Sequence, residues 1–76
     1  MSTKDVETSD IVLAATLKVK GCNLDRIEKI GNRGIFCFTN VDETVLQDFD
    51  LGHSLVEPFA FNNAIKALTT ATRRIN

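Results

Sequence analysis

The chain has no tryptophan or tyrosine, one histidine and two cysteines among its 76 residues. The cysteines, Cys22 and Cys37, form no Cys-X-X-Cys motif, and together with His53 they are a poor match to zinc-binding patterns. These absences predict a protein without a bound metal or cofactor, whose thiols stay reduced as in the cytoplasm. Because all five phenylalanines fit core positions, we also expect no surface aromatic side chain for stacking on bases.

Long hydrophobic runs are missing as well. No apolar stretch approaches the length of about 18 residues that a membrane-spanning helix needs. The first residues do not combine a basic segment with an apolar one, as a signal peptide does. We therefore expect a cytoplasmic protein that does not enter membranes.

The residues needed for catalysis are also scarce. An enzyme requires a nucleophile with its base, a pair of tuned carboxylates, or a metal site. His53 follows Gly52 in an expected loop, where a solvated turn residue is the ordinary reading. Cys37 lies inside an apolar stretch, where a free cysteine usually acts as a small buried hydrophobe. The sequence therefore predicts that the protein is not an enzyme.

The length and the hydrophobic pattern predict one α+β domain over residues 8–76, preceded by a flexible segment over residues 1–7. A helix is expected from Ile11 to Lys20, because Thr8-Ser9-Asp10 offers capping groups and Gly21 can end it. A second long helix is expected from Pro58 to about Arg74, with an apolar stripe at helical spacing.

Between these helices the pattern predicts a β-hairpin over residues 22–39. Gly31-Asn32-Arg33-Gly34 is the expected turn, and placing Gly31 opposite Gly34 sets Ile27 opposite Phe38. A short helix is expected from Thr39 or Asn40 to about Phe49, followed by a short third strand at Leu55-Val56. The predicted order is helix, strand, strand, short helix, short strand and long helix, around a small antiparallel sheet.

Both faces of the predicted hairpin carry apolar side chains, since side chains alternate across a sheet. Ile27, Phe36 and Phe38 share one face, and Ile30, Ile35 and Cys37 share the other. Either helices of the same chain cover both faces, or the second face is an interface. The shortness of the chain favours the interface, so we expect a homodimer that buries Ile30, Ile35, Cys37 and part of the long helix.

The charges are unevenly distributed, although the net charge is −1. Residues 34–63 hold five acidic side chains and no basic one, whereas residues 18–33 and 64–76 carry an excess of basic side chains. The basic residues could contact phosphates if they meet in space, with the hairpin entering a groove; otherwise they form a solvated surface that balances the acidic middle. The candidate contacts are Lys18, Lys20, Arg26, Lys29, Arg33, Arg73 and Arg74.

The order of these pieces resembles a small domain family of unknown function that phages and bacterial mobile elements carry. The resemblance spans about residues 7–75 and implies an α+β fold and a viral or mobile-element origin. It implies no functional residues, because the family has no assigned activity. It rests on Thr8-Ser9-Asp10-Ile11 with Leu13-Ala14-Ala15, on Ile35-Phe36-Cys37-Phe38-Thr39, on Leu55-Val56-Glu57-Pro58-Phe59-Ala60-Phe61, and on Asn63-Ala64-Ile65-Lys66-Ala67-Leu68.

Two functions follow from these observations. The first is a non-enzymatic accessory protein of a phage or mobile element, which acts by contact with a host or phage protein and forms a homodimer. The second is a small DNA- or RNA-binding regulator that uses the basic hairpin and the C-terminal arginines. A third hypothesis, a small-ligand pocket, rests on the clustering of Phe49, His53 and Phe59. If the chain is viral, its compartment is the host cytoplasm.

Overall fold

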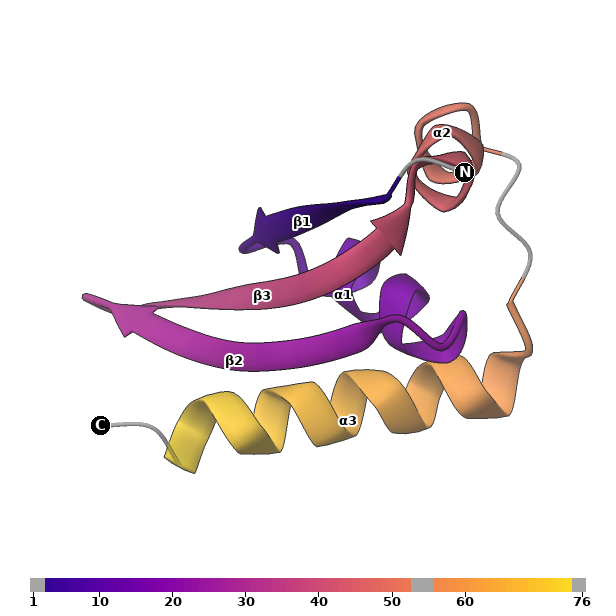
Figure 1. Ribbon diagram of the computed structural model, residues 1–76. Helices are drawn as coiled ribbons and strands as arrows, with labels where there is room; N and C mark the ends of the chain where they lie inside the picture. Colours follow the sequence, from indigo (N-terminus) through magenta and orange to yellow (C-terminus); the bar gives the residue numbers. More distant parts are fainter. Residues whose placement is uncertain (1–2, 53–55, 75–76) are drawn as a thin grey trace.

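The computed structural model describes residues 3–52 and 56–74 of the chain. In this part, one three-stranded antiparallel sheet in the order β1-β3-β2 packs with three helices (Figure 1). The α+β class predicted from the sequence is therefore confirmed. The elements are β1 (Thr3–Thr8), α1 (Ile11–Val19), β2 (Asn23–Ile30), β3 (Arg33–Asp42), α2 (Glu43–Asp50) and α3 (Pro58–Arg74).

The first strand, β1, falls where we expected a flexible segment, and no sequence pattern predicted it. It pairs along the edge of β3, with Val6 opposite Phe38. As an edge strand β1 places only Val6 against the core, so its sequence lacks an apolar alternation. The third strand was expected instead at Leu55-Val56. Leu55 lies outside the described residues, and Val56 is not in a strand.

The hairpin was predicted with the correct faces but the wrong register. Ile27 lies opposite Phe36 and Lys29 lies opposite Gly34, so the pairing is displaced by two residues from the expected one. The turn is shorter than expected, because Ile30 already pairs with Arg33. A displacement by an even number of residues leaves each side chain on its predicted face, since the side-chain period of a strand is two.

The core lies between the helices and one face of the sheet. Phe36 and Phe38 of β3 pack there against α1 and α3, together with Ile27 and Leu24 from β2. A bulge at Asp25 interrupts the pairing of β2 with β3, so that Leu24 points to the core and Arg26 to the opposite face. The buried core residues come from α1, β3 and α3: Ala14, Ala15, Leu17, Phe36, Phe38, Val41, Ala64 and Leu68.

The helix boundaries agree with prediction to within about one residue, except at the start of α2, and the capping group of α1 also differs. The carboxylate of Asp10, and not a hydroxyl, caps α1 by accepting from the backbone N–H of Val12 at 2.9 Å and of Leu13 at 3.4 Å. The helix α2 begins after Asp42 and not at residue 39 or 40, because β3 continues to Asp42. The predicted bounds of α3 are confirmed. None of the helices in the described part of the chain is long and apolar enough to cross a membrane.

Candidate functional site

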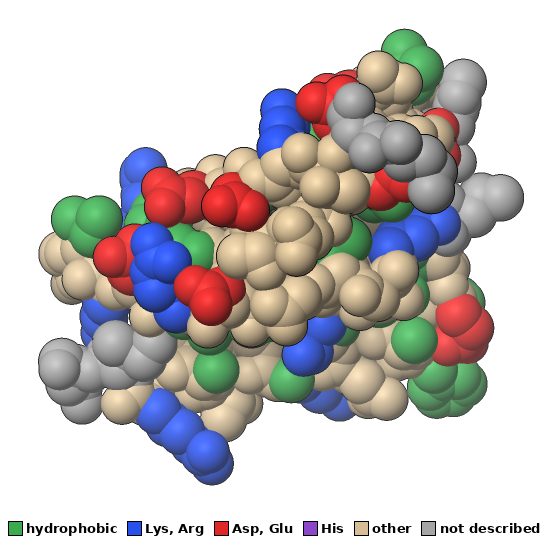
Figure 2. All heavy atoms as spheres, viewed as in Figure 1, with side chains coloured by type: hydrophobic (Ala, Val, Ile, Leu, Met, Phe, Trp, Pro, Cys, Tyr) green, Lys and Arg blue, Asp and Glu red, His purple; other side chains and the backbone are tan. Residues whose placement is uncertain are grey.

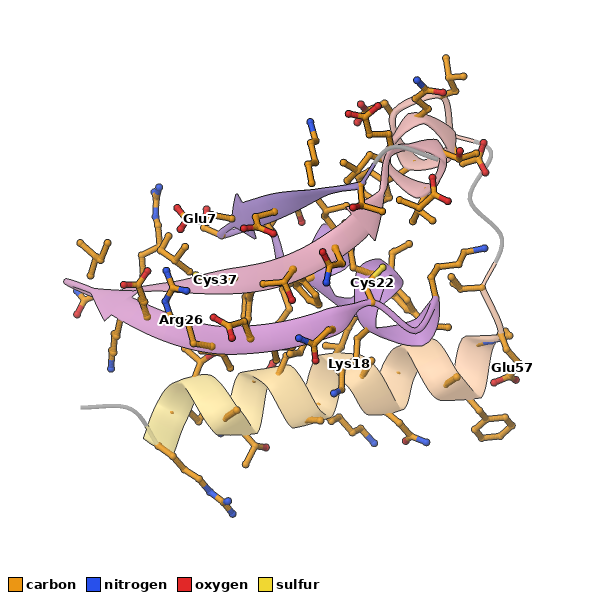
Figure 3. The ribbon with its side chains drawn as sticks, in the orientation of Figure 1. Glu7, Lys18, Cys22, Arg26, Cys37 and Glu57 are labelled. Carbon is orange, nitrogen blue, oxygen red and sulfur yellow. The ribbon has the colours of Figure 1, made fainter. Side chains whose placement is uncertain are left out.

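The face of the sheet opposite the helices, here called the open face, carries a charged cluster around one thiol. The guanidinium of Arg26 lies 3.6 Å from a carboxylate oxygen of Glu7 and 3.6 Å from one of Glu28. It also bonds the carboxylate of its neighbour Asp25 at 2.9 Å. These residues come from β1 and β2 and flank Cys37 of the central strand (Figure 3).

The thiol of Cys37 is buried beneath these side chains, with 3% of its surface exposed. It donates to the carboxylate of Glu28 at a sulfur–oxygen distance of 3.5 Å. Burial, and next the hydrogen bond to Glu28, raise the pKa of the Cys37 thiol above its ordinary value, although the charge of Arg26 acts in the opposite direction. A thiol that stays protonated near neutral pH is a poor nucleophile, so this geometry does not suit catalysis.

The same cluster has a set of atoms that could hold a cation. Ligand atoms of Glu7, Glu28 and Cys37 all lie within 4.8 Å of one another. However, the guanidinium of Arg26 lies within ion-pair distance of both carboxylates and places a positive charge beside this set of atoms. We assign the arrangement a structural role on the open face.

The open face also holds the three residues expected at a dimer interface. Ile30 is 68% exposed, Ile35 is half-buried, and Cys37 is buried. Acidic and basic side chains gather on this face of the sheet (Figure 2). The face is therefore mixed in character, and not the continuous apolar surface that the sequence predicted.

The second cysteine, Cys22, lies at the other end of β2 from the hairpin turn (Figure 3). Both cysteines are free thiols. Burial, with a smaller contribution from the negative charge of Asp42, raises the pKa of the Cys22 thiol. Cys22 packs against the core, so its position gives no sign of a catalytic role.

The predicted nucleic-acid contacts separate into three groups. Lys18 and Lys20 lie at the end of α1, away from the hairpin turn, and Arg26 is held in the charged cluster. The remaining four basic residues come from two element ends: Lys29 and Arg33 from the strand ends beside the hairpin turn, and Arg73 and Arg74 from the last turn of α3. Of these, Lys29 and Arg73 line a common cavity. We call this group the basic end; its members are Lys29, Arg33, Arg73 and Arg74.

None of the four residues of the basic end forms an ion pair with a carboxylate of the described residues. All four are exposed. Arg73 and Arg74 lie in the last turn of α3, where cations interact favourably with the helix dipole. Their charges are thus available to an anionic partner, whereas that of Arg26 is not.

A cavity of about 320 Å³ lies between the parts of the basic end. Its wall includes Lys29 and Asn32 of the hairpin, Thr69 and Arg73 of α3, and Ser9 just before α1. Gly34 allows the close approach of hairpin and helix, because a Cβ at this position would lie 2.7 Å from the methyl carbon of Thr72.

The cations of this site were predicted from the sequence, whereas its neutral polar residues were not. Ser9, Asn32 and Thr69 come from three separate segments, and their types are common in turns and exposed helix faces. No spacing within the sequence indicates that they share a cavity. The hypothesis of a small-ligand pocket formed by Phe49, His53 and Phe59 is not favoured. Phe59 is 79% exposed and does not line the cavity that Phe49 lines. His53 lies outside the described residues.

Comparison with protein-family models, with curated proteins and with solved structures finds no match to this chain. The candidate site therefore rests on its own geometry.

Proposed function

We propose that this protein binds nucleic acid through phosphate contacts at the basic end and catalyses no reaction there. The observation that supports this proposal is the meeting of hairpin and helix α3 around one cavity, whose lining includes Lys29 and Arg73. Arg33 at the hairpin turn and Arg74 in the last turn of α3 lie outside this lining, and none of the four has an acidic partner among the described residues. Lysine and arginine bind phosphate oxygens and release counterions, so such a surface attracts any strand irrespective of its sequence.

The proposal predicts weak and salt-dependent binding. Single strands give a slope of about −0.7 per phosphate contact in a plot of log affinity against log salt concentration. Four contacts therefore predict a slope of about −3 and a loss of affinity of about 50-fold between 50 and 200 mM salt. A dissociation constant in the range of about 10⁻⁴ to 10⁻⁶ M is expected at physiological salt.

Fluorescence anisotropy with a labelled oligonucleotide tests this proposal with a matched pair of variants. Arg73→Gln with Arg74→Gln removes two charges from the basic end, whereas Lys18→Gln with Lys20→Gln removes two charges from the other end. We expect the first variant to weaken binding and to reduce the slope by about 1.4, and the second to change neither. Equal effects of the two variants would exclude a localised site.

We propose homodimer formation through the open face as a second candidate function, favoured by the 68% exposure of Ile30. In this case the chain acts by protein–protein contact, as an accessory protein of phage or mobile-element type on the resemblance described above. Light scattering after size exclusion tests it. A dimer that Ile30→Asp converts to a monomer supports the candidate, and a monomer of 8.4 kDa at micromolar concentration excludes it.

A further inference from the structure

The cavity at the basic end has a volume of about 320 Å³, at the lower end of the range of about 300 to 1,000 Å³ found for small-ligand sites. This volume matches one small group.

The lining of this cavity combines positive charge with apolar surface. Lys29 of β2 and Arg73 of α3 supply the cations, and Ile11 and Phe36 supply the apolar surface. Ser9, Asn32 and Thr69 add neutral polar groups that can donate or accept hydrogen bonds.

Acidic groups are absent from the lining that the structure describes, and α3 contains no acidic residue. The acidic residue nearest in sequence to the lining residues Ser9 and Ile11 is Asp10. Its carboxylate accepts hydrogen bonds from the backbone N–H groups of Val12 and Leu13. Glu28, next to Lys29 in the chain, points to the open face, where it pairs with Arg26. An anionic ligand therefore meets no carboxylate in the cavity.

We propose that the cavity receives one unpaired nucleotide of a single strand, an inference that rests on the proposed function above. The phosphate is bound by Lys29 and Arg73, and the base lies against the apolar surface of Ile11 and Phe36, within reach of the neutral polar groups. Bases in a duplex are stacked and paired, so they cannot enter such a cavity without leaving the helix. The protein therefore prefers single strands to duplexes.

The experiment compares a single strand and a duplex of the same length by fluorescence anisotropy at one salt concentration. It uses two threonine substitutions on α3. Thr69→Leu fills the cavity without changing the charge, and Thr70→Leu makes the same change at an exposed position outside the lining. Far-UV circular dichroism and the melting temperature establish that both variants fold. Asn32→Ala, in the exposed hairpin turn, gives a second cavity variant if Thr69→Leu does not fold.

We expect the single strand to bind about tenfold more tightly than the duplex, and Thr69→Leu to remove most of this difference while Thr70→Leu retains it. Titration with a nucleoside monophosphate should shift the amide resonances of Ser9, Asn32 and Thr69 more than titration with inorganic phosphate does.

Two results would overturn the inference in different ways. If duplex and single strand bind equally, or if the two threonine variants behave alike, the cavity takes no nucleotide. The proposed function then stands, provided that Arg73→Gln with Arg74→Gln still weakens binding. If neither strand form binds, both the inference and the proposed function fail.

Discussion

Gly34 is the position where the contact between the hairpin and α3 can be tested most directly. It lies at the start of β3 opposite Lys29, and an added Cβ would be 2.7 Å from Cγ2 and 3.3 Å from Oγ1 of Thr72. Thr72 cannot easily turn away, because its side chain is β-branched and its hydroxyl donates to the carbonyl oxygen of Leu68 at 2.8 Å. The substitution Gly34→Ala must therefore displace α3 or break this hydrogen bond.

Two effects of opposite sign determine the change in stability. Overpacking of this kind costs about 1–3 kcal/mol. Replacing glycine by alanine within a strand recovers about 0.5–1 kcal/mol, because the unfolded chain loses conformational freedom. We expect Gly34→Ala to lower the free energy of unfolding by about 1 kcal/mol. For a domain of this size, that corresponds to a fall in melting temperature of about 4–8 °C.

A double-mutant cycle with Thr72→Ala separates the two effects. Removal of the Thr72 methyl and hydroxyl groups leaves only the backbone effect, so Gly34→Ala should become neutral or slightly stabilising in that background. Urea unfolding followed by circular dichroism measures all four proteins; tryptophan fluorescence cannot be used, since the chain has no tryptophan. If Gly34→Ala destabilises both backgrounds equally, the contact does not limit the approach of hairpin and helix.

Three further outcomes are expected. Asp10→Ala should lower the free energy of unfolding by about 0.5–2 kcal/mol, because α1 loses its cap. Asp10→Asn should retain most of the stability, because asparagine also caps helices, and thermal melts distinguish the two variants. The pKa of Asp42 is lowered chiefly by the hydrogen bond from the backbone N–H of Thr44. The charged carboxylate therefore stabilises the fold at pH values above the pKa that Asp42 has in the unfolded chain. This stabilisation is lost as the pH falls below about 4. Unfolding free energies at pH 6 and pH 3 should therefore differ more in the wild type than in Asp42→Asn, and equal differences would contradict this. In thiol labelling at pH 8, buried Cys37 should react more slowly than half-buried Cys22, and urea should abolish the difference.

The elements that sequence patterns predicted well are those with strong local signals. The helix α3 has a proline at its first position and an apolar stripe at helical spacing, and its bounds agree with prediction. The faces of the hairpin were also correct, because alternation alone determines them. The strand β1 gave no such signal, since an edge strand with one core residue does not differ from a polar tail.

The register of the hairpin could not be predicted from the alternation of side chains. A loop with glycine at both ends permits more than one turn length, and the positive φ of Gly31 (62°) selects the shorter turn in the structure. The consequence for the site is direct. The pairing of Lys29 with Gly34 brings this lysine beside α3 and its arginines, whereas the predicted pairing set it opposite Phe36.

Arg26 and Arg33 show why charge patterning alone did not identify the site. Both belong to the same basic segment of the sequence and to the same hairpin. Both side chains lie on the open face, because Arg26 pairs with Cys37 and Arg33 pairs with Ile30. Three carboxylates surround Arg26, while Arg33 lies at the hairpin turn without a carboxylate partner among the described residues. A charge already neutralised within the fold adds little to the binding of phosphate, because a strand must compete with the existing ion pairs. Arg26→Gln should thus leave the salt dependence of binding unchanged, whereas Arg33→Gln should reduce its slope by about 0.7. The opposite result would place the binding surface at the charged cluster around Cys37.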